Sequence, residues 1–174
     1  VNKYTLIPRP ETELMVERVL THYRFKNLFI LDVGTGSGCI ILSILKDLKN
    51  SYGIGIDTCK NAIKIANKNA KILKIESKVK FYHKSISARI NNRFDLIISN
   101  PPYVESLSIK KLSNDIKKFE PKIALDGGND GLDVIKKVIY KSKYILKKNG
   151  LLALEVGNGQ YRKVSKVLEC SGFR

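Results

Sequence analysis

The chain has 174 residues, 43% of them hydrophobic, which is enough for one domain with a proper core. Its formal net charge is +16 at pH 7, but the lysines are spread over the whole sequence, which favours solvated helix faces over a nucleic-acid-binding stripe. No run of about 18 apolar residues predicts a membrane span, and three isolated cysteines and two histidines predict a reducing, cytoplasmic compartment and no metal site.

Short β-branched segments alternate with helical patterns along the chain, which indicates a mostly parallel α/β sheet flanked by helices. The fourth strand is followed by a stretch of about 30 residues that we expect to be irregular, and a loop of that length is usually functional. The expected elements are a helix over 11–23, a strand over 29–33, a helix over 38–48, a strand over 52–57, a helix over 60–73, strands over 79–83 and 94–99, a helix over 131–146, a strand over 151–156 and a helix over 160–171.

A glycine-rich turn follows the first strand, where the backbone can approach a ligand at a helix N-terminus. Residue 39 is Cys, so the dinucleotide fingerprint Gly-x-Gly-x-x-Gly does not fit, and the lysine of a phosphate loop is absent. The spacing instead resembles motif I of class I methyltransferases, where the backbone cradles the amino-acid part of S-adenosylmethionine; a turn without a ligand is the alternative. The turn residues expected to bind the cofactor are Gly34, Thr35, Gly36, Ser37 and Gly38.

Asp57 ends the second strand, at the carboxyl edge of the sheet where doubly wound folds bind ligands. Its carboxylate can accept both hydroxyl groups of a ribose, and it can also cap the helix that follows. Combined with the glycine turn, it favours an adenosyl ligand.

Asn100-Pro101-Pro102-Tyr103 follows the fourth strand, and its prolines end that strand and supply carbonyl groups without N–H donors. The Asn100 carboxamide oxygen and the Pro101 carbonyl can both accept hydrogen bonds from one substrate NH₂ group. Tyr103 can stack on a flat amide or base, and a plain Asn-Pro turn is the alternative. Alignment and exclusion of water can supply most of the rate, so we assign no general base and expect Glu120, Asp126 and Asp130 to shape the long loop.

The whole chain resembles the HemK/PrmC family of release factor glutamine methyltransferases. The resemblance implies S-adenosylmethionine as cofactor and the glutamine of a Gly-Gly-Gln loop in peptide chain release factors as substrate. It also implies a Rossmann-like class I fold, in which Asn100 touches cofactor and substrate and Pro101, Pro102 and Tyr103 complete the glutamine pocket. Asn100, Pro101 and Tyr103 are the expected catalytic residues. The segments that carry the resemblance are residues 6–13, 100–103, 119–121, 124–125, 127–128, 130–132 and 155–157 with Gln160.

Three departures from the family pattern leave alternatives open. Ser85 and Ile86 stand where the family has an Asp and an aromatic residue near the adenine. We also expect a single catalytic domain over 1–174 without the family's N-terminal helical domain and last two strands. A ribosomal-protein glutamine methyltransferase, a nucleic-acid amino-methyltransferase and an inactive cofactor-binding remnant are the alternatives. The expected partner is a release factor as protein substrate. We expect a monomer that binds no membrane and forms no stable nucleic-acid complex, and proximity to the ribosome stays open.

Overall fold

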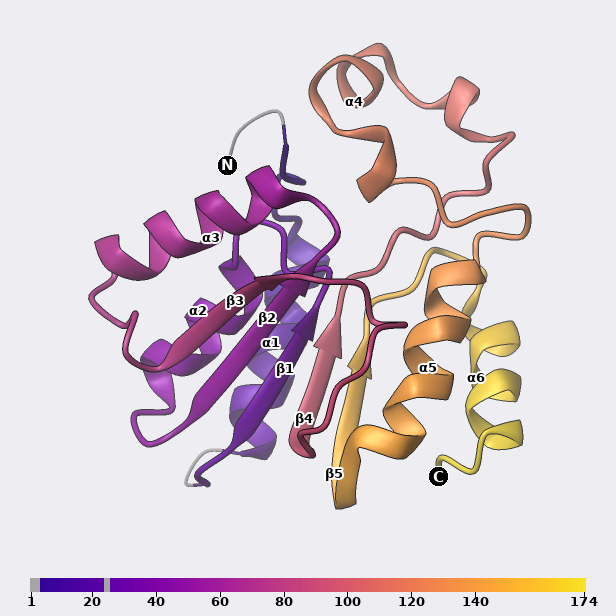
Figure 1. The fold of residues 1–174 in the computed structure, drawn as a ribbon. Coiled ribbons are helices and arrows are strands. Elements are labelled where there is room, and N and C mark those ends of the chain that lie inside the picture. Colours follow the sequence, from indigo (N-terminus) through magenta and orange to yellow (C-terminus); the bar gives the residue numbers. More distant parts are fainter. Residues whose placement is uncertain (1–3, 24–25) are drawn as a thin grey trace.

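A computed structural model describes residues 4–23 and 26–174. It contains a five-stranded parallel sheet in the order β3-β2-β1-β4-β5, with helices on both faces (Figure 1). The predicted Rossmann-like α/β fold is therefore confirmed. The strands are β1 (Phe29–Val33), β2 (Tyr52–Asp57), β3 (Val79–His83), β4 (Phe94–Ser99) and β5 (Leu146–Leu154). The helices are α1 (Pro10–His22), α2 (Cys39–Asp47), α3 (Lys60–Ile72), α4 (Asn114–Phe119), α5 (Asp133–Ile145) and α6 (Tyr161–Cys170), with 3₁₀ helices η1 (Ile109–Lys111) and η2 (Lys122–Ala124).

The sheet is the middle of three layers. Its one face packs against α1, α2 and α3 around Ile30 and Ile98, and its other face packs against α5 around Leu31 and Ile97. α6 packs beside α5, as Figure 1 also shows. Because β4 is covered on both sides, its apolar run is continuous, and burying each such side chain stabilises the fold by about 1.5–3 kcal/mol. No helix in the described part of the chain is long and apolar enough to cross a membrane.

The first four strands have the predicted bounds, whereas several other boundaries were predicted wrongly. β5 begins at Leu146 rather than at residue 151, because Leu146 already pairs with Phe94 of β4. The polar segment 147–150 forms an irregularity in the strand before Leu151 pairs with Leu96. α5 begins at Asp133 because Gly131 has a φ of +69°, outside the helical region. The stretch between β4 and α5 is not irregular throughout, since it contains η1, α4 and η2.

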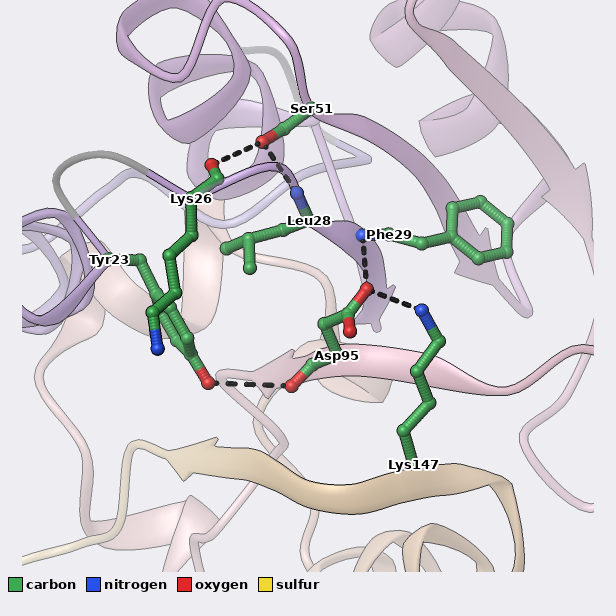
Figure 2. A network of polar contacts seen from close by, with 7 residues as sticks. All are labelled: Tyr23, Lys26, Leu28, Phe29, Ser51, Asp95 and Lys147. Atoms are coloured by element: carbon green, nitrogen blue, oxygen red, sulfur yellow. Dashed lines mark hydrogen bonds and ion pairs between the residues drawn. The ribbon is translucent and has the colours of Figure 1, made fainter.

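Polar side chains hold the amino ends of the strands together (Figure 2). Asp95 Oδ2 accepts hydrogen bonds from the Phe29 N–H and from Lys147 Nζ, both at 2.8 Å. The Ser51 hydroxyl oxygen accepts from the Leu28 N–H at 3.0 Å. These contacts connect the starts of β1, β2, β4 and β5. The long loop and the glycine turn follow the opposite, carboxyl ends of the strands.

Candidate functional site

Two cavities lie at the carboxyl end of the sheet. In doubly wound folds ligands bind there, where neighbouring strands diverge in their connections, and in this sheet that point lies between β1 and β4. The first cavity has a volume of about 300 Å³ and the second about 170 Å³. Both are lined by Leu6, Asn100 and Ala124. Asn100 therefore stands where one space meets the other.

The glycine turn forms one wall of the first cavity, which is lined by Gly34, Thr35, Gly36 and Ser37. Gly34 has a φ of +70°, and a Cβ added to it would meet no atom within 4 Å. The backbone above this turn is therefore open to a ligand. Gly38 does not line the cavity, because it sits behind the turn against Leu42, Phe81 and Ala66, which an added Cβ would approach to 3.0–3.3 Å.

Asp57 lines the same cavity and braces the turn. Its Oδ2 accepts from the Gly36 N–H and its Oδ1 from the Cys59 N–H, both at 2.8 Å. Cys59 is the N-cap residue of α3, so Asp57 does not cap that helix in the way we considered from the sequence. Each carboxylate oxygen keeps a further acceptor lone pair, which leaves Asp57 able to bind a hydroxyl group.

Asp32 lies fully buried below the turn. Its Oδ2 accepts from the Thr35 hydroxyl at 2.7 Å, while its Oδ1 has no hydrogen-bond partner among the described residues. Burial raises the pKa of Asp32 to about 7, the Thr35 hydroxyl acts against that rise, and the nearby charge of Asp57 adds to it. Close to neutral pH this side chain can therefore exchange a proton.

Asn100 leaves β4 at a point tied to β1, because the Ser99 hydroxyl donates to the Val33 carbonyl at 2.7 Å. Asn100 Nδ2 donates to Thr12 Oγ1 at 3.1 Å. Pro102 lines the first cavity and Tyr103 the second, while Pro101 is buried and lines neither. The structure thus gathers Asn100, Pro102 and Tyr103 around the junction.

Tyr103 is held in place from the α6 side. Its carbonyl oxygen accepts from Gln160 Nε2 at 2.9 Å, and Gln160 Oε1 accepts from the Gly157 N–H at 2.9 Å. A Cβ added to Gly131 would come within 2.4 Å of the Tyr103 carbonyl oxygen, so only glycine allows this close approach. Burial raises the pKa of the Tyr103 hydroxyl, and the charge of Glu155 adds to that rise, so the ring stays a neutral stacking surface.

The long loop closes over the second cavity. Arg9, just before α1, forms an ion pair with Glu120, whose side chain is only 3% exposed and whose Oε2 has no partner within residues 4–23 and 26–174. Asp126 Oδ1 accepts from the Ser106 hydroxyl at 2.6 Å and Asp130 Oδ2 from Lys136 at 2.7 Å. All three carboxylates hold the loop, in agreement with the role expected for them.

Local sequence patterns missed part of the cavity walls. Thr5, Leu6 and Pro8 line the first cavity from the segment before α1, and Ile123 and Ala124 line it from η2. Neither segment has a periodicity or a motif of its own that indicates ligand binding, and only the family resemblance drew attention to part of them. Ser85 and Ile86 also line this cavity.

Sequence comparisons point to methyltransferases. The family profile described as methyltransferase small domain matches residues 10–118. A protein of Bradyrhizobium diazoefficiens named release factor glutamine methyltransferase is 41% identical over 173 residues, covering 97% of this chain and 58% of that protein. A protein of the same name from Rhodospirillum rubrum is 42% identical, covering 97% of this chain and 52% of that protein. The chain thus spans between half and two thirds of the length of these relatives, and the resemblance predicted from the sequence is confirmed.

Solved structures of related shape agree on the fold. The ribosomal protein L11 methylase from Lactobacillus delbrueckii subsp. bulgaricus matches with a TM-score of 0.73 at 18% identity, covering 98% of this chain and 72% of that one. TrmN from Thermus thermophilus matches with a TM-score of 0.64 at 17% identity, covering 88% of this chain and 40% of that one.

Proposed function

Since the chain belongs to the methyltransferase small domain family, we propose that it transfers a methyl group from S-adenosylmethionine to the side-chain amide nitrogen of a glutamine. The observation that carries this proposal is Asn100, which lines both cavities. A methyl donor in the first cavity and an amide in the second would meet at this residue.

The first cavity fits the cofactor. The open backbone at Gly34, Thr35, Gly36 and Ser37 would hold its amino-acid part, and Asp57 would accept hydrogen bonds from its ribose. Ile86, in place of the family's aromatic residue, offers apolar surface for the adenine. When bound, S-adenosylmethionine supplies an electrophilic methyl group on a sulfonium.

The residues after β4 would align the acceptor. The carbonyl group of the Asn100 side chain can accept from an N–H bond of a primary amide and so hold its nitrogen toward the methyl donor. Pro101, the second acceptor expected from the sequence, is buried and lines neither cavity. Tyr103 supplies a neutral flat surface in the second cavity. Transfer would break the bond between the methyl group and the sulfonium sulfur, leave S-adenosylhomocysteine, and release one proton of the amide nitrogen to water. These residues therefore need only position the amide and limit access of solvent.

The proposed substrate is the glutamine of the Gly-Gly-Gln loop of a release factor, because the curated relatives carry that name. A glutamine of a ribosomal protein is the alternative, since the same site would accept it. We propose a monomeric catalytic domain over 1–174. We also propose that it works in the cytoplasm, because its three cysteines are free, as is usual in a reducing compartment. The net charge of +16 fits work near the ribosome. Because the lysines are spread over the whole sequence, we propose no stable nucleic-acid complex.

The test is methyl transfer from labelled S-adenosylmethionine to a release factor, to the same factor with its Gly-Gly-Gln glutamine changed to glutamate, to ribosomal protein and to DNA. Label only in the unchanged release factor is expected. Asn100→Ala should slow the single-turnover rate roughly 100-fold or more while the affinity for the cofactor changes little. Asn50→Ala, an exposed asparagine far from the site, is the matched control. Label in DNA, or an equal loss of binding with unchanged chemistry in Asn100→Ala, would contradict the proposal.

A further inference from the structure

Asn100 is the last member of a hydrogen-bonded chain that starts at a carboxylate. Asn100 Nδ2 donates to Thr12 Oγ1 at 3.1 Å, and Thr12 Oγ1 donates to Glu155 Oε2 at 2.6 Å. Thr12 lies in the first turn of α1 and is 4% exposed, and Glu155 directly follows β5. The Glu155 N–H donates to the Ser99 carbonyl at 3.0 Å, which holds its backbone beside Asn100.

The chain of bonds has only one possible direction. An ionised carboxylate only accepts, so the single hydroxyl proton of Thr12 goes to Glu155. The Thr12 oxygen then has only lone pairs left for Asn100, and the Asn100 side chain must offer its NH₂ group. The orientation of a primary amide is decided by such partners, since its oxygen and nitrogen ends have nearly the same shape.

We infer that Thr12 and Glu155 are positioning residues that fix the orientation of the Asn100 carboxamide and so keep its oxygen available to the acceptor amide. This inference rests on the proposed function. An inverted Asn100 side chain would present an NH₂ group to the NH₂ group of the substrate, and neither could accept. It would also place an oxygen against the Thr12 oxygen, which has no proton left to give.

If the hydrogen bond between Thr12 and Glu155 only joined α1 to the end of β5, its loss would lower stability without changing the orientation of Asn100 or the rate of transfer. We call the hydrogen-bonded chain from Glu155 through Thr12 to Asn100 the relay. Thr12→Val keeps the shape of the side chain and removes the hydroxyl, so it breaks both hydrogen bonds of the relay. Thr12→Ser keeps the hydroxyl and restores the relay. Thr21→Val is the matched control, because Thr21 lies on the same helix and its hydroxyl donates only to the Glu17 carbonyl, at 2.9 Å.

Two measurements on the same variants test the relay. The first follows the side-chain NH₂ resonances of Asn100 by NMR, assigned by their loss in Asn100→Asp. The second is single-turnover methyl transfer at saturating cofactor and substrate. We expect Thr12→Val to shift these resonances and to slow transfer roughly 10- to 100-fold with cofactor affinity within about twofold of wild type. Thr12→Ser and Thr21→Val should match wild type in both.

Glu155→Gln tests the direction. A glutamine can either accept from Thr12 or donate to it, so the Asn100 side chain is free to take both orientations. Transfer should fall less than in Thr12→Val, and combining the two changes should add no further loss, as expected for members of one network. Additive losses, or unchanged Asn100 resonances in Thr12→Val, would overturn the inference.

The outcomes separate this inference from the proposed function. If wild type does not methylate a release factor, the proposed function is wrong, while the resonances still report whether Thr12 orients Asn100. If wild type is active and Thr12→Val transfers methyl groups equally fast, the relay is wrong and the proposed function stands.

Discussion

The two ends of the parallel sheet use similar residues in opposite ways. At the amino ends, Asp95 has its carboxylate bound by a backbone N–H and a lysine, and Ser51 takes part in two backbone contacts (Figure 2). At the carboxyl ends, Asp32 and Glu120 each keep a buried carboxylate oxygen that finds no partner in the described ranges. The turn at this end is built from glycines with positive φ and opens onto a cavity.

The two ends differ in whether their carboxylate oxygens have hydrogen-bond partners. An unpaired buried acceptor costs about 1–3 kcal/mol, so a fold keeps few of them, and they are informative where they occur. Among the described residues three buried side-chain atoms lack a partner. Two of them, on Asp32 and Glu120, lie around the proposed site, and the third, Ser142 Oγ, lies in the last turn of α5, while the polar contacts that Figure 2 shows join the strand starts. Changes at the amino ends should therefore alter stability alone, and changes at the carboxyl ends should also alter ligand binding, titration and transfer.

The largest effect is expected at Asp32, from pH. Its pKa of about 7 in the folded state lies above the ordinary value of 3.8. Between about pH 4 and pH 7 the folded state keeps a proton that the unfolded state has lost, so the free energy of unfolding falls as the pH rises through that range and is unaffected by this group above it. Asp32→Asn removes the dependence. Relative to wild type, the variant should gain stability from pH 4.5 to pH 8 by at most roughly 4 kcal/mol.

Urea unfolding of both proteins at several pH values and constant ionic strength measures that gain. Asp47→Asn, an exposed carboxyl group at the end of α2, is the control for the loss of one charge. A stability difference between wild type and Asp32→Asn that stays constant from pH 4.5 to pH 8 would mean that Asp32 titrates normally despite its burial.

The next largest effect is expected at Asp57. Asp57→Ala removes a proposed ribose acceptor together with the acceptor of the Gly36 N–H, so the affinity for S-adenosylmethionine should fall by about 1–3 kcal/mol. Asp57→Asn keeps one carbonyl acceptor and should lose less. Isothermal calorimetry gives both values, with Asp47→Ala as the control. Equal affinity in wild type and Asp57→Ala, or tighter binding of NAD than of S-adenosylmethionine, would remove the adenosyl assignment.

Features encoded by neighbouring residues were predictable from the sequence. The apolar runs located β1 to β4, and glycine spacing located the turn above Asp32. The start of β5 was missed because Leu146 already pairs with Phe94, and the polar segment 147–150 forms an irregularity before pairing resumes at Leu151, which no local pattern reveals. The relay was missed for the same reason, since Thr12 and Glu155 are 143 residues apart and meet only in the folded chain. Tertiary contact, rather than residue type, makes them part of the site.

The smallest effect is expected at the amino ends. Asp95→Ala removes a charge-assisted bond to the Phe29 N–H and the contact with Lys147, and should lower the free energy of unfolding by about 1–2 kcal/mol. Lys147→Met removes only the ion pair. Because the Lys147 side chain is 46% exposed, water and salt screen the pair, and the loss should stay below about 1 kcal/mol and shrink further in salt. Lys148→Met, the exposed neighbour, controls for charge.

Both amino-end variants should bind S-adenosylmethionine and transfer methyl groups like wild type at temperatures where they stay folded. The reason is that Asp95 and Lys147 contact strand starts, while the cavities are lined from strand ends, the segment before α1 and the long loop. Chemical denaturation and the single-turnover assay, run on the same preparations, separate the two properties. A loss of transfer in Asp95→Ala at full folding would show that the two ends of the sheet are coupled and that their division of roles is wrong.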